Sequence, residues 1–163
     1  MARGRPDRTR PAAPAGTARA AALRLLGRRD YTVAELRAKL LDRGFPPDDT
    51  ARALDTLTAA GLASDRRAAL AHIRTGSRVK GRGRHRLRQE LERRGVGPDL
   101  AAELLAEHSD DDERAALDRL VARKRPPGRL SMADRRRLYQ QFLRRGFAAD
   151  LIARALKEPG TDF

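Results

Sequence analysis

The chain has 163 residues, with 36 Lys and Arg against 22 Asp and Glu for a net charge of +14, and it has no cysteine. The lack of cysteine excludes disulfides and thiolate metal sites, and no apolar run approaches the roughly 18 residues that cross a bilayer. The strong positive charge indicates a polyanionic partner or an acidic protein surface, and we expect a cytoplasmic protein.

The composition favours an all-α protein. Aromatic residues make up only 4% and Trp is absent, while Ala, Leu, Arg and Glu, which are strong helix formers, are abundant. Residues 1–16 hold three prolines and four arginines without periodic apolar residues, and they are predicted to be a disordered basic arm. The stretch lacks the apolar core of a secretory signal.

Helical patterns begin at Thr17, which is placed to cap the first helix. A second helix is predicted from Thr32, because Glu35 three residues later completes a capping box. Gly44 stands where a residue with positive φ would end this helix.

One phrase then occurs three times in the chain. "AKLLDRGFPPD" (38–48), "QELERRGVGPD" (89–99) and "QQFLRRGFAAD" (140–150) place their glycines 51 residues apart. In each copy a helix is expected to end at the glycine, and the hydrophobic residue that follows is expected to fold back onto its last turn. The residues of these predicted turns are Gly44, Phe45, Gly95, Val96, Gly146 and Phe147.

The repetition predicts three tandem three-helix repeats at 17–61, 64–106 and 110–158, followed by a C-terminal tail at 159–163. Each repeat is too short to bury a sizeable core alone, so we expect the repeats to stack into an elongated, curved array.

Two arginine-rich segments connect the first and second helices of the second and third repeats. Residues 74–88 hold six arginines and one lysine without an acid, and residues 123–137 hold seven basic residues against Asp134. The glycines of the first segment suggest a flexible loop, which could track phosphates, dock on acidic side chains or serve only as a solvated linker. The candidate filament- or nucleic-acid-binding residues are Arg74, Arg78, Lys80, Arg82, Arg84, Arg86, Arg88, Arg123, Lys124, Arg125, Arg129, Arg135, Arg136 and Arg137.

No pattern indicates an enzyme, a metal site or a cofactor. The acidic run 107–114 has no glycine or glutamate at the positions that a calcium loop requires, and acids at a helix start account for it without a metal. His72 is expected to pack at an interface between repeats, and no histidine has a catalytic partner at a defined spacing.

The chain resembles the RecX family of RecA recombinase regulators over residues 17–158. The resemblance rests on "ALRLLGRRDYTVAELRAKLLDRGF", "LTAAGLASDRRAALAHIR", "GRGRHRLRQELERRGV" and "FLRRGFAADLIARAL", in this order and spacing. It implies an all-helical protein of tandem three-helix repeats that acts in recombination and DNA repair. Such a protein lies in the groove of the RecA filament on single-stranded DNA and inhibits strand exchange, ATP hydrolysis and co-protease activity. The resemblance implies no cofactor and no catalysis, and we expect a monomer.

Two other functions stay open from the residues alone. A helix–turn–helix protein that binds DNA directly, as a nucleoid or transcription factor, would need base-reading side chains on a recognition helix. The predicted third helix at 98–107 is instead rich in Ala, Leu and acids. A scaffold that binds some other acidic protein is also compatible with the repeats.

Overall fold

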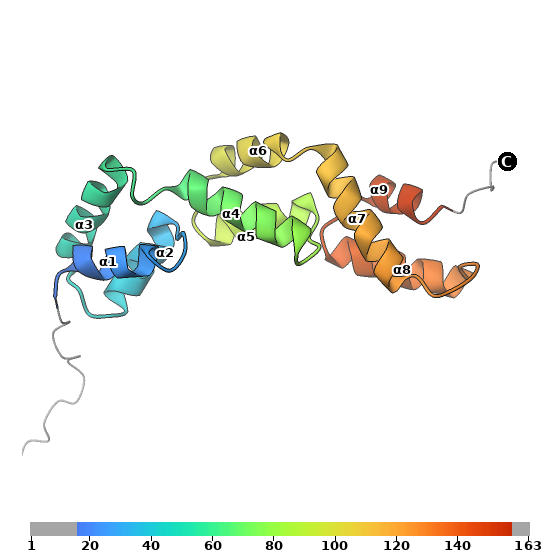
Figure 1. Ribbon diagram of the computed structural model, residues 1–163, viewed down its shortest axis with the longest axis horizontal. Coiled ribbons are helices and arrows are strands. Elements are labelled where there is room, and N and C mark those ends of the chain that lie inside the picture. The colour runs from blue at the N-terminus through green and yellow to red at the C-terminus, as the bar shows by residue number, and fades with distance from the viewer. Residues whose placement is uncertain (1–15, 158–163) are drawn as a thin grey trace, which may run out of the picture. The chain divides into compact units, whose positions relative to one another are not determined.

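The computed structural model describes residues 16–157, so the predicted arm, apart from Gly16, and the predicted tail lie outside the described residues. The described residues form nine α-helices and no strand, which confirms the all-α prediction (Figure 1). The helices are α1 Ala18–Leu26, α2 Val33–Leu41, α3 Pro47–Ala59, α4 Asp65–Arg78, α5 Arg84–Arg93, α6 Pro98–Glu107, α7 Asp110–Lys124, α8 Met132–Arg144 and α9 Ala149–Ala155.

The helices fall into three consecutive groups, and each group has its own hydrophobic core. The core of α1–α3 gathers around Leu36, Leu40 and Leu57, and that of α4–α6 around Leu87 and Leu91. The core of α7–α9 contains Phe142 and Phe147, the largest fully buried side chains among the described residues. The fold is thus a tandem series of three-helix groups. We propose that the sequence repeats have the boundaries 17–61, 64–106 and 110–158.

The repeated phrase ends the second helix of every group as predicted. Gly44, Gly95 and Gly146 have φ values of 83°, 80° and 86°. The next residue in each copy donates its backbone N–H to a carbonyl five residues earlier, as in the bond from Phe147 to Phe142 at 3.3 Å. The hydrophobic side chains after the glycines are buried, so each turn joins two helices and fills the core between them.

The helix starts follow equally local chemistry. The side chain of Thr17 accepts a hydrogen bond from the amide of Ala20, and Thr32 and Glu35 form the predicted capping box. Pro47 and Pro98 occupy the first positions of α3 and α6, where proline removes no intrahelical hydrogen bond.

The chain divides into two compact units, residues 1–64 and residues 65–163. The first described group, α1–α3, lies in unit 1. Groups α4–α6 and α7–α9 lie together in unit 2, where α4 packs against α7. None of the helices in residues 16–157 is long and apolar enough to span a membrane.

Candidate functional site

The positive charge is concentrated in unit 2. Residues 65–157 carry 24 Lys and Arg against 13 Asp and Glu, whereas residues 16–64 carry 8 against 6. Both arginine-rich segments of the sequence lie in unit 2, which makes its surface the candidate interface.

The first arginine-rich segment is mostly helical instead of a flexible loop. Arg74 and Arg78 belong to the last turns of α4, and Arg84, Arg86 and Arg88 to the first turns of α5. Only residues 79–83 connect the two helices. The glycines of this segment allow close packing, because a Cβ would lie 2.4 Å from Leu87 at Gly76, 2.8 Å from Leu120 at Gly81 and 2.4 Å from Gly146 at Gly83.

The first turn of α5 is held by the third group of helices. The amides of Gly83 and His85 donate to the carbonyls of Arg145 and Gly146, at 2.8 and 3.1 Å. The amide of Arg84 donates to Oε1 of Glu113 at 2.8 Å. These donors have no partner inside α5, so the start of α5 is capped by the end of α8 and by a carboxylate of α7.

A side chain at Gly83 would not fit in this joint. A Cβ there would lie 2.4 Å from backbone atoms of Gly146 and Phe147, and a Cβ at Gly146 would lie 2.3 Å from the amide of Arg86. The backbones of the second and third groups therefore touch, with no side chain between them. We call this contact the α5–α8 joint.

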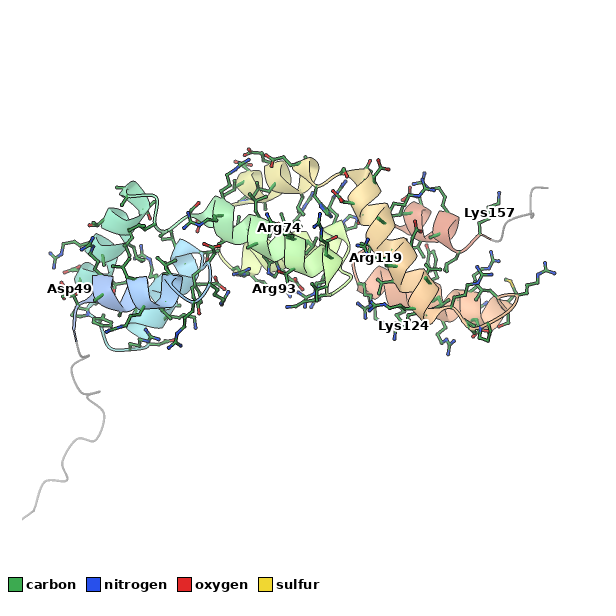
Figure 2. The ribbon with its side chains drawn as sticks, in the orientation of Figure 1. Asp49, Arg74, Arg93, Arg119, Lys124 and Lys157 are labelled. Atoms are coloured by element: carbon green, nitrogen blue, oxygen red, sulfur yellow. The ribbon has the colours of Figure 1, made fainter. Side chains whose placement is uncertain are left out.

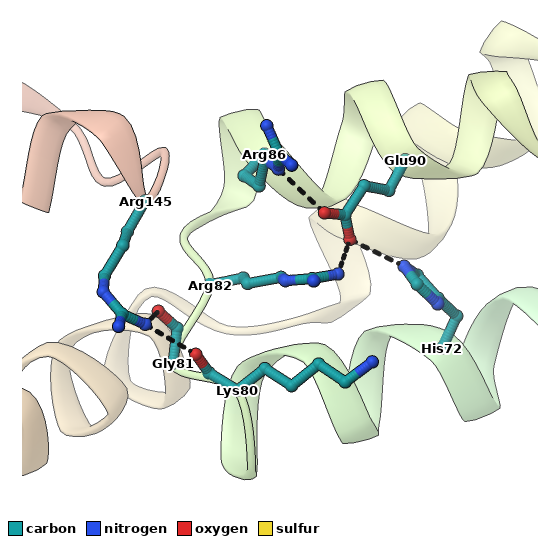
Figure 3. Close-up of polar contacts among 7 residues, drawn as sticks. All are labelled: His72, Lys80, Gly81, Arg82, Arg86, Glu90 and Arg145. Carbon is teal, nitrogen blue, oxygen red and sulfur yellow. Dashed lines mark hydrogen bonds and ion pairs between the residues drawn. The ribbon is translucent and has the colours of Figure 1, made fainter.

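Arg145 of the repeated phrase strengthens the joint. Its Nη1 donates to the carbonyls of Lys80 and Gly81, at 2.8 and 3.3 Å (Figure 3). The side chain of Arg84 also contacts the start of α7, because its Nη2 lies 2.8 Å from both the His108 carbonyl and Oδ1 of Asp110.

Glu90 gathers three basic side chains inside the second group. Its carboxylate accepts hydrogen bonds from Arg82, from Nε of Arg86 at 2.8 Å and from Nε2 of His72 at 2.9 Å (Figure 3). His72 thus contacts α5 of its own group, so the predicted place at an interface between repeats is wrong.

Burial and hydrogen bonding set the charges in this cluster. Burial by itself would raise the pKa of Glu90, but the hydrogen bonds from Arg86 and His72 and the charge of Arg82 leave that pKa below its usual value. Desolvation lowers the pKa of His72 in spite of its contact with Glu90. At neutral pH a neutral imidazole therefore donates to a charged carboxylate. Arg82 and Arg86 pair with Glu90, and Arg84 pairs with Asp110 and Glu113. All three arginines therefore have structural partners within the chain.

The second arginine-rich segment spans the end of α7, the connection 125–131 and the start of α8. Arg137 pairs with Asp134 at 2.9 Å, and Arg125 and Arg129 also interact with other groups of the protein. Arg135 is half-buried.

The other predicted residues remain available to a partner. They share an exposed side chain that makes no ion pair or hydrogen bond to the described residues. This free basic set comprises Arg74, Arg78, Lys80, Arg88, Arg123, Lys124 and Arg136.

Arg119 has the same properties, although the sequence patterns did not single it out. It lies one helical turn before Arg123 on α7, and Figure 2 shows it there together with Lys124. The spacing of four residues in a helix was the signal that could have found it.

The third helix of the second group has the opposite charge. Helix α6 contains no Lys or Arg, and its Glu103 and Glu107 pair with Arg66 of α4 at 2.7 and 2.5 Å. No cluster of three potential metal ligands occurs within residues 16–157.

Comparison with known proteins identifies two family models in the chain. The model described as the first three-helix domain of RecX matches residues 18–57, and that of the second three-helix domain matches residues 64–105.

Two curated relatives are more than a third identical to the chain over the aligned residues. "Regulatory protein RecX" of Chromohalobacter salexigens is 39% identical over 86% of this chain and 91% of its own length. The protein of the same name from Mycobacterium ulcerans is 37% identical over 80% of this chain and 78% of its own. The crystal structure of RecX from Lactobacillus salivarius has the same fold, with a TM-score of 0.75 at 20% identity over 85% of this chain and 92% of that one.

Proposed function

The chain belongs to the RecX family of regulatory proteins, and we propose that it binds the RecA filament on single-stranded DNA and inhibits strand exchange, ATP hydrolysis and co-protease activity. It acts by binding as a monomer along the filament groove in the cytoplasm, without a cofactor and without catalysing a reaction.

The observation that carries this proposal is the free basic set on unit 2. A filament of protein on DNA offers both carboxylates and phosphates, and exposed guanidinium groups bind either of them. Long-range attraction by this charge accelerates the encounter and makes it sensitive to salt.

The α5–α8 joint makes the second and third groups suitable for one extended contact. Binding across neighbouring recombinase subunits inhibits the filament only if the protein prefers one filament state over another, because a ligand shifts an equilibrium only by its differential affinity.

Direct sequence-specific DNA binding by a helix–turn–helix is less well supported. A recognition helix needs exposed side chains that reach base edges. The third helix of the second group instead presents Asp99, Glu103 and Glu107, without a basic residue.

The test is the ATPase and strand-exchange activity of RecA on single-stranded DNA, with and without this protein. We expect inhibition at well below one molecule per recombinase subunit. The variant Arg74→Glu/Arg88→Glu/Lys124→Glu should lose most of it, because it reverses three members of the free basic set without touching the joint.

The matched control is Arg28→Glu/Arg37→Glu/Arg43→Glu, which makes the same charge change at exposed positions of unit 1. It should retain inhibition. Absence of inhibition by the wild type, together with tight binding to naked duplex DNA, would support the DNA-binding alternative instead.

A further inference from the structure

A groove of about 340 Å³ runs between α4 and α7 in unit 2. Its lining residues are Ser77, Arg78, Gly81, Ala116, Arg119, Leu120, Ala122 and Arg123. The floor is small and mostly apolar, because Gly81 packs closely on the buried Leu120 and Ala116 is also buried.

Three arginines also line the groove, beside this apolar floor. Arg119 and Arg123 are one turn apart on α7, and Arg78 comes from the last turn of α4. All three are exposed and make no ion pair with the described residues. No acidic side chain lines the groove, whereas the neighbouring groove along α4 contains Glu107 and Asp112 beside its arginines. The α4–α7 groove therefore has an unbalanced positive charge over an apolar floor.

We propose that the α4–α7 groove binds an acidic peptide segment of a partner protein that carries an apolar side chain between its carboxylates. The carboxylates pair with Arg78, Arg119 and Arg123, and the apolar side chain lies against Leu120 and the neighbouring alanine. Guanidinium groups bind carboxylates in a fixed, bidentate geometry, and removing an apolar side chain from water adds to the affinity.

The lining favours a peptide over a nucleic acid strand. Single-stranded DNA and RNA are usually held by aromatic side chains on which bases stack, and no aromatic residue lines this groove. A phosphate backbone would use the arginines but leave the apolar floor without a partner.

This inference rests on the proposed function and refines it, because it assigns these three arginines to the protein component of the filament. Peptide binding can be measured without the recombinase, so failure of this inference can be distinguished from failure of the proposed function.

The first experiment measures binding of two fluorescein-labelled peptides by anisotropy. One is a 12-residue peptide of Asp and Glu with two central leucines, and the other has serines in place of the leucines. We expect the leucine peptide to bind at least fivefold more tightly. Equal affinities would overturn the proposal, because the groove would then recognise charge alone.

Variants localise the binding. Arg119→Glu/Arg123→Glu should weaken the leucine peptide at least tenfold, and Ala122→Leu, which fills the groove without a charge change, at least fivefold. The control Arg93→Glu/Arg144→Glu has the same charge change at exposed positions away from the groove and should bind like the wild type. If Ala122→Leu binds normally, or if the two double variants weaken binding equally, the groove is not the site.

A 12-nucleotide oligo-dT tests the other occupant. Its affinity should be unchanged by Ala122→Leu. If the oligonucleotide competes for the groove and loses affinity with this variant, the groove binds nucleic acid and the proposal is wrong.

The second experiment uses the absence of cysteine from the chain. Ala122→Cys, at an exposed position, provides a single attachment point for a benzophenone photocross-linker. On RecA filaments formed on labelled single-stranded DNA, we expect the cross-link on the recombinase polypeptide. A cross-link on the DNA, or none from a protein that still sediments with the filament, would overturn the assignment.

Discussion

Glu90 is a buried carboxylate whose neighbours are three side chains of basic type, and its charge is what holds them together. Arg82 comes from the connection before α5, Arg86 from the preceding turn of α5, and His72 from α4. A carboxylate removed from water loses hydration that these hydrogen bonds replace. Glu90 thereby fixes the connection against both helices of its group.

Replacing Glu90 with Gln should therefore lower the free energy of unfolding by about 1–3 kcal/mol. The amide is neutral and cannot accept from all three donors, so buried hydrogen-bonding groups lose partners. Chemical denaturation at pH 7 measures the change. Glu92→Gln removes the same charge two positions later on the exposed face and should be near neutral. Equal stability of both variants would show that the cluster contributes nothing.

The same cluster predicts a dependence of stability on pH. The pKa of His72 is lower in the folded protein than its ordinary value of 6.5, mainly through desolvation, so below pH 6.5 the unfolded chain binds more protons. Stability must then fall as the pH drops from 6.5 towards the folded pKa. The lowered pKa of Glu90 adds a second loss below its ordinary value of 4.5.

Denaturation midpoints measured between pH 7 and pH 4 test this prediction. His72→Gln retains a donor for Glu90 and cannot titrate, so the loss that begins near pH 6.5 should become smaller, while the loss below 4.5 stays. An unchanged profile would show that the upper part of the loss does not come from His72.

At the residue scale, sequence predicts what lies within one turn and misses partners that are farther away. Thr32 and Glu35 are recognisable as a capping box because the motif spans three residues. From the sequence, Arg84 is expected to be an unpaired charge. Its acidic partner Glu113 lies 29 residues later, on another helix. Sequence therefore locates the basic segments but cannot separate their structural arginines from the free ones.

The helix ends carry most of the structural information at the next scale. Each copy of the repeated phrase ends one helix, starts another and places a hydrophobic residue in the core. The third copy has a further role in the α5–α8 joint, where its carbonyls cap α5. The first role follows from the glycine spacing. The second depends on tertiary packing and could not be predicted from the spacing.

The joint predicts a strong effect of a single methyl group. Gly83→Ala should destabilise unit 2 by about 1–3 kcal/mol, because its Cβ would overlap backbone atoms that cannot move aside as a flexible side chain would. Hydrogen exchange of the amides of Arg84 and His85 should accelerate, whereas the protected amides of α1–α3 should not change.

Gly97→Ala is the matched control for this substitution. Gly97 has φ −59°, no atom lies within 4 Å of the position that a methyl group would take there, and it also precedes the first residue of a helix in unit 2. It should lose only the small preference for glycine at a helix cap, below about 1 kcal/mol. If both variants were equally stable, the close backbone contact at the joint would not matter to folding.

Across the whole molecule, charge is distributed unevenly between the two units. Unit 1 is nearly balanced in charge over its described residues, whereas unit 2 carries a large basic excess. Part of that excess is neutralised by ion pairs of arginines with Glu90, Asp110 and Glu113. The remainder includes the free basic set and Arg119, which are exposed to a partner.

Salt dependence then reports what this remainder contacts. Each phosphate of single-stranded DNA that a basic residue neutralises adds about 0.7 to the negative slope of log affinity against log salt. Filament binding by the wild type should therefore weaken steeply with salt. Arg74→Glu/Arg88→Glu/Lys124→Glu should reduce the slope by up to about 2 if all three residues contact phosphates.

The Arg119→Glu/Arg123→Glu variant provides the contrast on the same surface. If the α4–α7 groove holds carboxylates of a peptide, this variant should weaken filament binding at all salt concentrations but change the slope less per residue, because few condensed counterions are released from a protein surface. Filament co-sedimentation at salt concentrations from about 50 to about 300 mM measures both slopes. Equal slope changes per residue would mean that the groove arginines contact phosphate, and the division of this surface into protein and DNA contacts would be wrong.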